Sequence, residues 1–287
     1  MVRVQNFQLS DRLQTIASHI SEGESVADIG TDHGYIPIWL LSRGITDKVI
    51  LTDINKGPLE KALGNFRKWM PAFTPELRQG SGLSVLKPGE ADDIIIAGMG
   101  GILIGRILEA HPEVVNSADR LILQPRNHSF TLRNQLRRLQ GFVITDEEIA
   151  LESGKNCEII TLTRRKAASD SELRRAEQIQ ELEARLGLEE RIYDEVPVMY
   201  ALYSDRRYHD YLELKSRAEI RVIESILSHG RSDYADSRRH RAEERLRAFR
   251  KIKELQERLV AKQDDQNRKS AGSDPCGGAG KSPGILG

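Results

Sequence analysis

Residues 26–34 read Val-Ala-Asp-Ile-Gly-Thr-Asp-His-Gly, and residues 48–53 read Lys-Val-Ile-Leu-Thr-Asp. The first stretch predicts a buried strand that runs into a glycine turn, and the second predicts a strand that ends in a carboxylate. Strands of this kind form an open α/β sheet, which binds ligands at the carboxyl ends of its strands. Gly30 and Gly34 lack a Cβ atom, so the turn can approach a ligand closely. Asp53 is placed to accept hydrogen bonds from a ribose.

The turn over residues 28–34 is acidic and lacks the G-x-G-x-x-G pattern of a dinucleotide site. Asp28 and Asp32 would repel a diphosphate, but they would suit a cation with an amino-acid tail. S-adenosylmethionine, with its sulfonium and α-ammonium groups, is the common cofactor of that kind. A plainer interpretation makes Asp28 a residue at a strand end and the glycine an ordinary turn, and the second strand with Asp53 weighs against it.

Strands and helices alternate along the first part of the chain. Strands are expected at residues 25–29, 49–52, 77–79, 91–97, 120–124, 142–149 and 157–163. Helices are expected at residues 9–20, 37–41, 58–70, 102–110 and 130–139. The last two strands read as an antiparallel hairpin. This order predicts an α/β fold with a Rossmann-like, seven-stranded methyltransferase sheet, in a catalytic domain of residues 1–165.

Charged helical segments replace the strands beyond residue 165. Apolar residues recur every three or four positions over 208–227 and 242–259, with a polar break at Gly230, which predicts a helical coiled-coil hairpin in a domain of residues 166–265. Residues 206–262 hold 16 Lys and Arg against 10 Asp and Glu. That excess is compatible with phosphate contacts and also with a solvated helix surface. The Gly-, Ser- and Pro-rich residues 266–287 are expected to be disordered.

The composition gives no sign of a membrane or a metal. Lys and Arg together number 43, as do Asp and Glu, so net charge does not point to a nucleic acid. Cys157 and Cys276 lie far apart, which argues against a disulfide framework or a cysteine zinc site. No stretch approaches the roughly 20 apolar residues of a membrane span. We therefore expect a soluble cytoplasmic protein, a monomer or weak homodimer, with no membrane and no metal among its partners.

The chain resembles the TrmK family of bacterial tRNA (adenine-22-N1)-methyltransferases in six motifs that occur in order. They are Leu9-Ser-x-Arg-Leu13, Asp28-Ile-Gly-Thr-Asp-His-Gly34, Gly80-x-Gly-Leu83, Gly89-Glu-Ala-Asp92, Ile96-Ala-Gly-Met-Gly-Gly101 and Leu121-Ile-Leu-Gln-Pro125. The resemblance covers about residues 9–165 by motif and the helical hairpin by pattern. It implies S-adenosylmethionine as cofactor, tRNA as substrate, and a Rossmann-like domain followed by a coiled-coil hairpin.

The resemblance also implies roles for particular residues. The expected cofactor-binding residues are Asp28, Gly30, Asp32, His33, Gly34, Asp53, Ile54, Ser81, Gly82, Ala97, Gly98, Met99 and Gly100. The expected substrate-binding residues are Gln124, Arg126, His128 and Arg133. Ser81 stands where the family usually has Asp, so a hydroxyl must hold the adenine amino group. Arg126 stands where the family typically has Asn, which weakens a base-reading role there, whereas His128 and Arg133 match.

The chemistry of the expected reaction makes few demands on the protein. Adenine N1 carries a lone pair in the ring plane and can attack an electrophilic methyl group directly, so neither a metal nor a strong base is required. Alignment helps, and so does an acceptor for the N6 amine. Asp32 is the candidate catalytic residue, together with the backbone of residues 97–100. Because N1 lies on the Watson-Crick edge, the target base must be flipped out or unpaired.

Each of these residues also has a purely structural interpretation. Asp32 could cap the following helix, and His33 could be a structural or cofactor contact, since the reaction needs no proton shuttle. Gly98 and Gly100 could serve only to turn a loop. The arginines at 126, 133, 137 and 138 could be solvated or could contact phosphates. Trp39 and Trp69 are expected in the core.

Two other functions stay open at this point. One is a small-molecule methyltransferase, which would carry lid elements around the pocket, whereas this chain spends its extra length on a basic helical hairpin. The other is a non-catalytic binding module with a vestigial α/β domain, which Ser81 mildly favours. An NAD-linked dehydrogenase is disfavoured by the missing glycine triplet.

Overall fold

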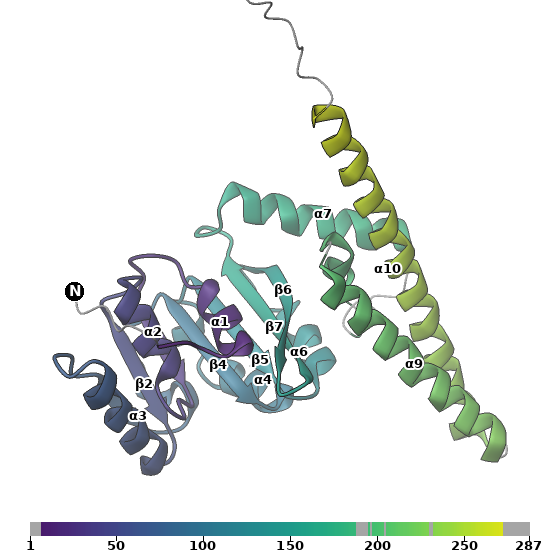
Figure 1. The fold of residues 1–287 in the computed structure, drawn as a ribbon. Helices are drawn as coiled ribbons and strands as arrows, with labels where there is room; N and C mark the ends of the chain where they lie inside the picture. The colour runs from purple at the N-terminus through teal and green to yellow at the C-terminus, as the bar shows by residue number, and fades with distance from the viewer. Residues whose placement is uncertain (1–6, 188–194, 196, 204, 230–231, 272–287) are drawn as a thin grey trace, which may run out of the picture.

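Seven strands form one mixed sheet in the order β3-β2-β1-β4-β5-β7-β6 (Figure 1). The computed structural model describes residues 7–187, 195, 197–203, 205–229 and 232–271. The strands are β1 Val26–Ile29, β2 Val49–Asp53, β3 Glu76–Gln79, β4 Asp93–Met99, β5 Arg120–Pro125, β6 Phe142–Glu152 and β7 Lys155–Arg164. Strands β1 to β5 run parallel, and β7 runs antiparallel to both β5 and β6. The predicted methyltransferase sheet with its terminal hairpin is confirmed.

The strand order reverses beside β1, which pairs with β2 on one side and with β4 on the other. The chain moves outward from β1 through β2 to β3, and then begins again at β4 and moves the other way. A crevice opens at such a point, outside the carboxyl ends of the strands, and ligands of open α/β sheets bind there. The fold thus brings the end of β1, the end of β2 and the end of β4 to one place.

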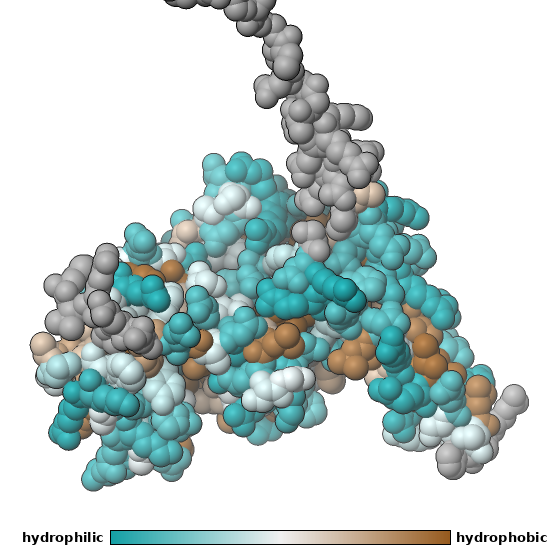
Figure 2. Space-filling view, viewed as in Figure 1, coloured by the Kyte–Doolittle hydropathy of each residue, from teal (hydrophilic) through white to brown (hydrophobic). Residues whose placement is uncertain are grey.

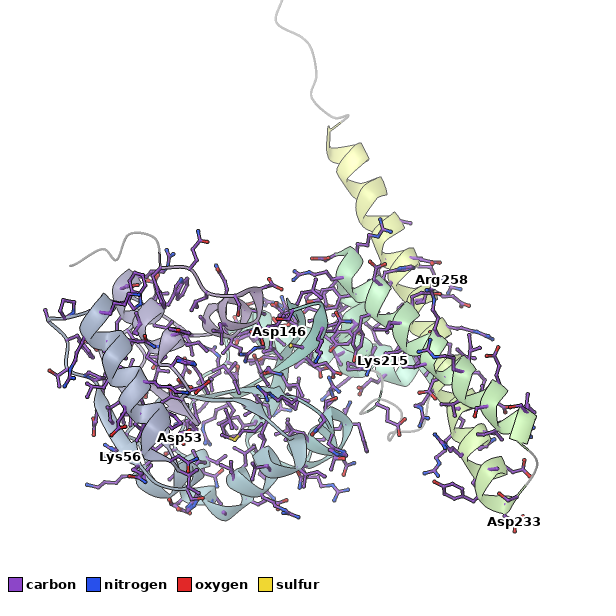
Figure 3. The ribbon with its side chains drawn as sticks, turned by 60° about the horizontal axis from the view of Figure 1, so that its bottom comes forward. Asp53, Lys56, Asp146, Lys215, Asp233 and Arg258 are labelled. Atoms are coloured by element: carbon purple, nitrogen blue, oxygen red, sulfur yellow. The ribbon has the colours of Figure 1, made fainter. Side chains whose placement is uncertain are left out.

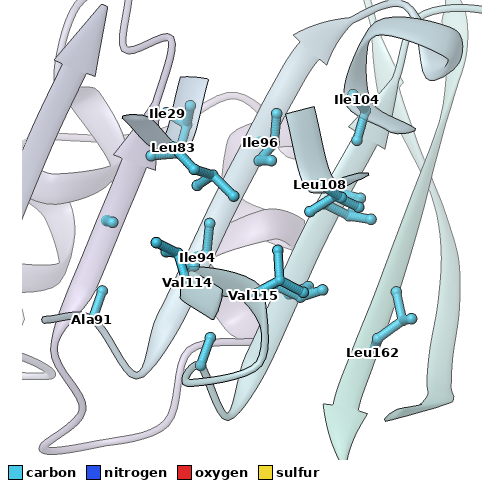
Figure 4. Close-up of a cluster of buried hydrophobic side chains, with 14 of the residues drawn as sticks. Ile29, Leu83, Ala91, Ile94, Ile96, Ile104, Leu108, Val114, Val115 and Leu162 are labelled. Atoms are coloured by element: carbon cyan, nitrogen blue, oxygen red, sulfur yellow. The ribbon is translucent and has the colours of Figure 1, made fainter. Parts of the chain in front are cut away.

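Helices cover both faces of the sheet and bury its apolar side chains. The helices of this part are α1 Asp11–Ser18, α2 Tyr35–Arg43, α3 Lys56–Trp69, α4 Gly101–Ala110, α5 Pro112–Val115 and α6 Ser129–Leu136, with a 3-10 turn η1 at Gly82–Val85. Ile94 and Ile96 of β4 pack with Ile104 and other residues on one face (Figure 4). Ile95 packs on the other face with the cluster beneath α1, α2 and α3. Alternation of this kind explains why β4 is apolar without interruption.

The second part of the chain is helical, and its last two helices, α9 and α10, form a long arm (Figure 1). Its elements are α7 Asp170–Leu186, η2 Val198–Leu202, α9 Arg206–His229 and α10 Asp233–Ala271. Helices α9 and α10 lie side by side, with Lys253 Nζ 2.5 Å from a Glu213 oxygen and Arg245 Nη2 2.8 Å from a Glu219 oxygen. The predicted pair of helices is present. Its expected break at Gly230 lies outside the described residues.

A third core attaches the arm to the sheet. Tyr200 of η2, Tyr211 of α9 and Phe249 of α10 are buried together with Ile149 of β6. Helix α7 and η2 were not predicted as separate elements. Helix α10 continues to Ala271, beyond the expected domain boundary at residue 265, and the rest of the expected disordered tail, residues 272–287, lies outside the described residues. Within the part of the chain described, no helix is long and apolar enough to cross a membrane.

Hydrophilic side chains dominate the face shown in Figure 2, and separate hydrophobic patches interrupt them on both the α/β part and the arm. Figure 3 shows side chains projecting outward from α9 and α10, among them the labelled Lys215 of α9 and Arg258 of α10. The arm therefore presents a charged surface while its buried stripe packs internally.

Candidate functional site

A cavity of about 880 Å³ opens at the carboxyl ends of β1, β2 and β4. This is the position at which the strand order reverses. The predicted site residues that line it are Asp28, Gly30, Asp32, His33, Gly34, Asp53, Ala97, Gly98, Met99 and Arg126. Residues that are far apart in the sequence thus form one wall, as the expected sheet requires.

The turn after β1 depends on a glycine at position 30. Gly30 has a φ of 76°, a backbone conformation that side chains with a Cβ rarely adopt. A Cβ built there would lie 2.2 Å from Met99 Cε. The backbone N–H groups of Gly30 and Thr31 both donate to the Thr52 carbonyl, at 2.8 and 2.9 Å. The turn is therefore fixed against the end of β2 and packs tightly on Met99 at the end of β4.

Asp28 places a buried carboxyl group in the cavity wall. The residue is 8% exposed, and burial raises the pKa of its carboxyl to about 6, although the nearby Thr31 hydroxyl and the charge of Arg12 act in the opposite direction. At neutral pH the carboxyl group is ionised although burial deprives its charge of hydration. A cation in the cavity would compensate for that loss.

Asp32 stands at the mouth of the cavity. Its carboxylate lies 3.2 Å from His33 Nε2 and 3.7 Å from Lys61 Nζ, and its side chain is 68% exposed. The N-cap of α2 is Gly34, with no hydrogen bond from a capping side chain, so the interpretation of Asp32 as a helix cap is wrong. His33 stacks on Tyr35 with ring centroids 5.1 Å apart. Asp32 is therefore accessible to a ligand from the cavity side.

Asp53 ends β2 and lines the same cavity (Figure 3). One of its oxygens accepts a hydrogen bond from the Asn55 backbone N–H at 2.7 Å, which fixes the orientation of the carboxylate. Its carbonyl accepts from the Gly80 N–H at 2.9 Å, which brings the turn at residues 80–82 beside the end of β2.

Several predicted cofactor residues lie beside the cavity without lining it. They are Ile54, Ser81, Gly82 and Gly100. The Ile54 side chain is 61% exposed, directly after Asp53. Gly82 has a φ of 55° and packs against Ile107, a structural use of that glycine. Contacts of these residues with a cofactor remain predictions.

A bulge in β4 shapes the opposite wall. The pairing of β4 with β5 shifts between Ala97 and Met99, and Gly98 between them has a φ of 79°. The Gly98 N–H donates to the side-chain oxygen of Gln124 at 3.2 Å. Bulges next to active sites change the direction in which a strand presents its backbone. Here the bulge brings the backbone of residues 97–99 to the cavity.

Gln124, expected to bind substrate, is instead buried behind this bulge and is 2% exposed. Its oxygen accepts hydrogen bonds from Gly98 and from Arg12, and its Nε2 donates to the Pro125 carbonyl at 3.0 Å. The hydrogen-bonding groups of this amide are thus used inside the protein, because a buried amide needs internal partners. Gln124 supports the wall and does not face the cavity.

The loop after β5 joins the cavity to helix α6. Arg126 lines the cavity, and its backbone N–H donates to the Met99 carbonyl at 2.7 Å. His128, the N-cap of α6, is exposed and has a φ of 51°, an uncommon conformation for a residue other than glycine. Both predicted substrate-binding residues therefore lie at or near the mouth, and their contact with substrate remains a prediction.

Arg133, also expected to bind substrate, lies in the interior and is 1% exposed. Its Nε lies 2.5 Å from a Glu147 oxygen and its Nη2 lies 2.6 Å from a Glu158 oxygen. The Tyr211 hydroxyl of the arm donates to Glu158. Burial alone would raise the pKa of Glu158, but the charges of Arg133 and Lys215 lower it to about 2. Arg133 thus joins α6, the hairpin and the arm.

Several residues that line the cavity were not predicted from the sequence. Arg12 lines it and donates through Nε to a Glu152 oxygen at 2.7 Å. Trp69, expected in the core, lines the cavity with Phe7 and Tyr35; the Phe7 ring lies 5.1 Å from Trp69 and 5.8 Å from Tyr35. The motif that begins at Leu9 contains Arg12 and was the available signal. In the residues that the structure describes, no cluster of His, Cys, Asp and Glu could hold a metal ion.

The sheet order and the cavity at its switch point define a Rossmann-like methyltransferase domain. Residues 9–160 match the family model described as a methyltransferase domain, and the chain belongs to that family.

Within this family, the chain is similar to TrmK proteins. It is 41% identical over 153 residues to the tRNA (adenine(22)-N(1))-methyltransferase of Bacillus subtilis strain 168, a match that covers 53% of this chain and 64% of that relative. The match therefore spans less than two thirds of the relative's length.

Solved structures extend the similarity into the helical part. The crystal structure of the B. subtilis m1A22 tRNA methyltransferase TrmK superposes with a TM-score of 0.70 at 29% identity, covering 86% of this chain and 99% of that one. A Streptococcus pneumoniae protein in complex with S-adenosyl-L-methionine superposes with a TM-score of 0.59 at 28% identity, covering 85% and 99%. The resemblance to the TrmK family that the six motifs predict is confirmed.

Proposed function

We propose that this protein transfers a methyl group from S-adenosylmethionine to N1 of an adenine in tRNA, at position 22 as in the B. subtilis relative. The observation that carries the proposal is the acidic cavity at the switch point, lined by Asp28, Asp32 and Asp53 and bordered by the bulge at Gly98. The similarity to TrmK proteins over both parts of the chain supports the choice of substrate.

The residues of the cavity fit this cofactor. Asp28 and Asp32 offer negative charge to its ammonium and sulfonium groups, and Asp53 offers a fixed carboxylate to the ribose hydroxyls. Gly30 leaves room for Met99 Cε, which packs against the turn and forms part of the cavity wall. Three carboxylates would repel the pyrophosphate of a dinucleotide. When bound, S-adenosylmethionine supplies an electrophilic methyl group on a positively charged sulfur.

The work of the protein in this reaction is alignment. The adenine N1 lone pair needs to point along the S–CH3 bond, and holding it there removes most of the entropic barrier. Asp32 and the backbone carbonyls of residues 97–100 are the candidate acceptors for the N6 amine, because Asp32 and residues 97–99 line the cavity. An acceptor there stabilises the positive charge that develops on the ring as N1 is methylated. In this role Asp32 is a catalytic residue.

The tRNA has to present its adenine unpaired, because N1 lies on the edge that pairs. Arg126 and Lys68 line the cavity, and Lys61 lies beside Asp32, so cations surround the opening where phosphates would pass. The basic arm of α9 and α10 offers a further phosphate-contacting surface. We also propose that the protein acts in the cytoplasm as a monomer or weak homodimer, since its substrate is found there.

Methylation of an unmodified tRNA transcript tests this proposal. We expect wild-type protein to form 1-methyladenosine and Asp32→Asn to lose at least about tenfold in kcat, because an amide is a weaker acceptor for N6. Asp47→Asn, an exposed aspartate away from the cavity, is the matched control and should act like wild type. A wild-type protein that binds S-adenosylmethionine but leaves tRNA unmethylated would overturn the proposal. Unchanged kcat in Asp32→Asn would remove Asp32 from the mechanism.

A further inference from the structure

The first turns of α4 and α6 meet beside the cavity. The Gly101 N–H donates to the Asn127 carbonyl at 2.9 Å, and a Cβ on Gly101 would lie 2.5 Å from the His128 carbonyl oxygen. Arg126, immediately before this contact, lines the cavity. Residues 128–130 are therefore held at a fixed position at the edge of the proposed active site.

An aromatic side chain is exposed at this position. Phe130 is 47% exposed, and its ring centroid lies 6.3 Å from the imidazole of His128, with the two planes tilted by 56°. His128 is exposed as well. Ile102 and Leu103, on the first turn of α4, are 38% and 50% exposed. Across the described part of the α/β domain, Phe130 is the one Phe, Tyr or Trp with an exposed side chain.

The backbone of His128, which carries one of these two rings, adopts an uncommon conformation. Only His128 and Ser153 among the described residues other than glycine have a positive φ. Ser153 lies in the tight turn between β6 and β7, where such a conformation is common. His128 is the N-cap of a helix, where an extended conformation is the usual one. Residues in such conformations persist where the surrounding structure enforces them and are concentrated at functional sites.

The charges around Phe130 favour an anionic partner. Neither α4 nor α6 has an acidic residue in its first turn, and the guanidinium of Arg126 lies at the cavity side of the loop. An exposed ring beside an imidazole is a surface on which proteins stack single-stranded bases. A base that leaves its pair for methylation leaves its neighbours without their usual stacking partner.

We propose that Phe130, together with His128, stacks against an unpaired tRNA base next to the adenine that is methylated. The inference rests on the proposed function and adds a second contact to it: the cavity holds the target base, and the ring pair holds its neighbour. Phe130 is in this account a positioning residue, because it touches the substrate outside the reacting base and fixes how the target enters.

Kinetic measurements on variants of full-length protein test the stacking. Phe130→Ala should raise KM for tRNA about tenfold or more, as loss of a base–aromatic stack does, and should leave the Kd for S-adenosylmethionine unchanged. Phe130→Trp should restore the wild-type KM, whereas Phe130→Leu, which keeps an apolar side chain without a ring face, should not. Leu151→Ala, equally exposed at 45% on β6, is the control.

Fluorescence reports the stacking without catalysis. A tRNA transcript with 2-aminopurine beside the target adenine should be quenched by wild-type protein and not by Phe130→Ala, and an unchanged Kd for S-adenosylmethionine shows that the variant is folded. Quenching that persists in Phe130→Ala, or a Phe130→Leu variant equal to wild type, would overturn this inference alone. A wild-type protein that makes no 1-methyladenosine would overturn the proposed function as well. Self-association of wild type that Phe130→Ala abolishes would identify the surface as a protomer interface and contradict the inference.

Discussion

The Arg12 guanidinium donates to the side-chain oxygen of Gln124 at 3.2 Å, and the Gly98 N–H donates to the same oxygen. Helix α1 is thereby connected to the bulge that forms one wall of the cavity. The charge of Arg12 also lowers the pKa of Asp28 on the other wall. A single residue of α1 therefore influences both the shape of the site and its charge.

Two substitutions of Arg12 should therefore separate its effect on the shape of the site from its effect on the charge of the site. Arg12→Lys keeps the charge but loses the planar fork that reaches Glu152 and Gln124. We expect kcat for tRNA methylation to fall about tenfold in Arg12→Lys with little change in its pH profile. In Arg12→Ala the acidic limb of the profile should also move to higher pH, because the pKa of Asp28 rises. Arg67→Ala, an exposed arginine of α3, is the control, and equal profiles in all variants would contradict the account.

The tight contact at Gly30 predicts a specific loss of cofactor affinity. Gly30→Ala and Gly23→Ala should each cost about 1–2 kcal/mol of unfolding free energy, because both glycines have a positive φ. Only at Gly30 would the new Cβ meet another atom, Met99 Cε, which has to move into the cavity. We therefore expect calorimetry to give at least tenfold weaker S-adenosylmethionine binding in Gly30→Ala alone.

Met99→Ala in the Gly30→Ala background should recover part of this affinity. Equal losses of affinity in Gly30→Ala and Gly23→Ala would mean that the contact with Met99 has no effect on the ligand site.

Binding of S-adenosylmethionine should depend on pH through Asp28. A bound cation favours the ionised carboxylate, so the pKa of Asp28 in the complex is lower than the value of about 6 in the free protein. Affinity should consequently be constant above that pKa and fall as pH drops through it, by up to tenfold per pH unit. Isothermal titration between pH 5 and 8 measures this slope. Asp28→Asn should bind more weakly at pH 8 and show a flatter profile; a profile as steep as wild type would exclude Asp28 as its source.

The buried triad of Arg133, Glu147 and Glu158 should matter for stability. Arg133→Met removes the cation and leaves two buried carboxylates without their guanidinium partner. Breaking a buried ion pair in this way lowers the free energy of unfolding by about 3–5 kcal/mol. Urea unfolding should show a loss of that size. Arg206→Met, whose ion pair with Asp210 on α9 is exposed, should lose less than about 1 kcal/mol. Similar values for the two variants would show that the triad is not a structural junction.

The sheet and most of the cavity follow from local sequence. Runs such as residues 94–97 are apolar enough to predict a buried strand, and glycines with a carboxylate beside them mark the turn at a strand end. The register of the strands then brings Asp28, Asp53 and Gly98 together without further information. Helix ends were less predictable: the helix expected over residues 9–20 runs from Asp11 to Ser18.

The residues that were placed incorrectly depend on tertiary partners. An arginine followed by a buried pair of glutamates, 14 and 25 positions later, carries no pattern that separates Arg133 from a surface arginine. The amide of Gln124 likewise looks available until its bonds to Arg12 and Gly98 are seen. Helix α7 buries only Leu182 among its residues, so no apolar stripe announces it.

Transfer of a labelled methyl group to tRNA would establish the proposed reaction. The protein is incubated with an unmodified tRNA transcript and S-adenosylmethionine that carries a deuterated methyl group, and the tRNA is digested to nucleosides for mass spectrometry. We expect deuterated 1-methyladenosine, located at position 22 by mapping of nuclease fragments. Label in another nucleoside, or tRNA without label although the cofactor binds, would contradict it.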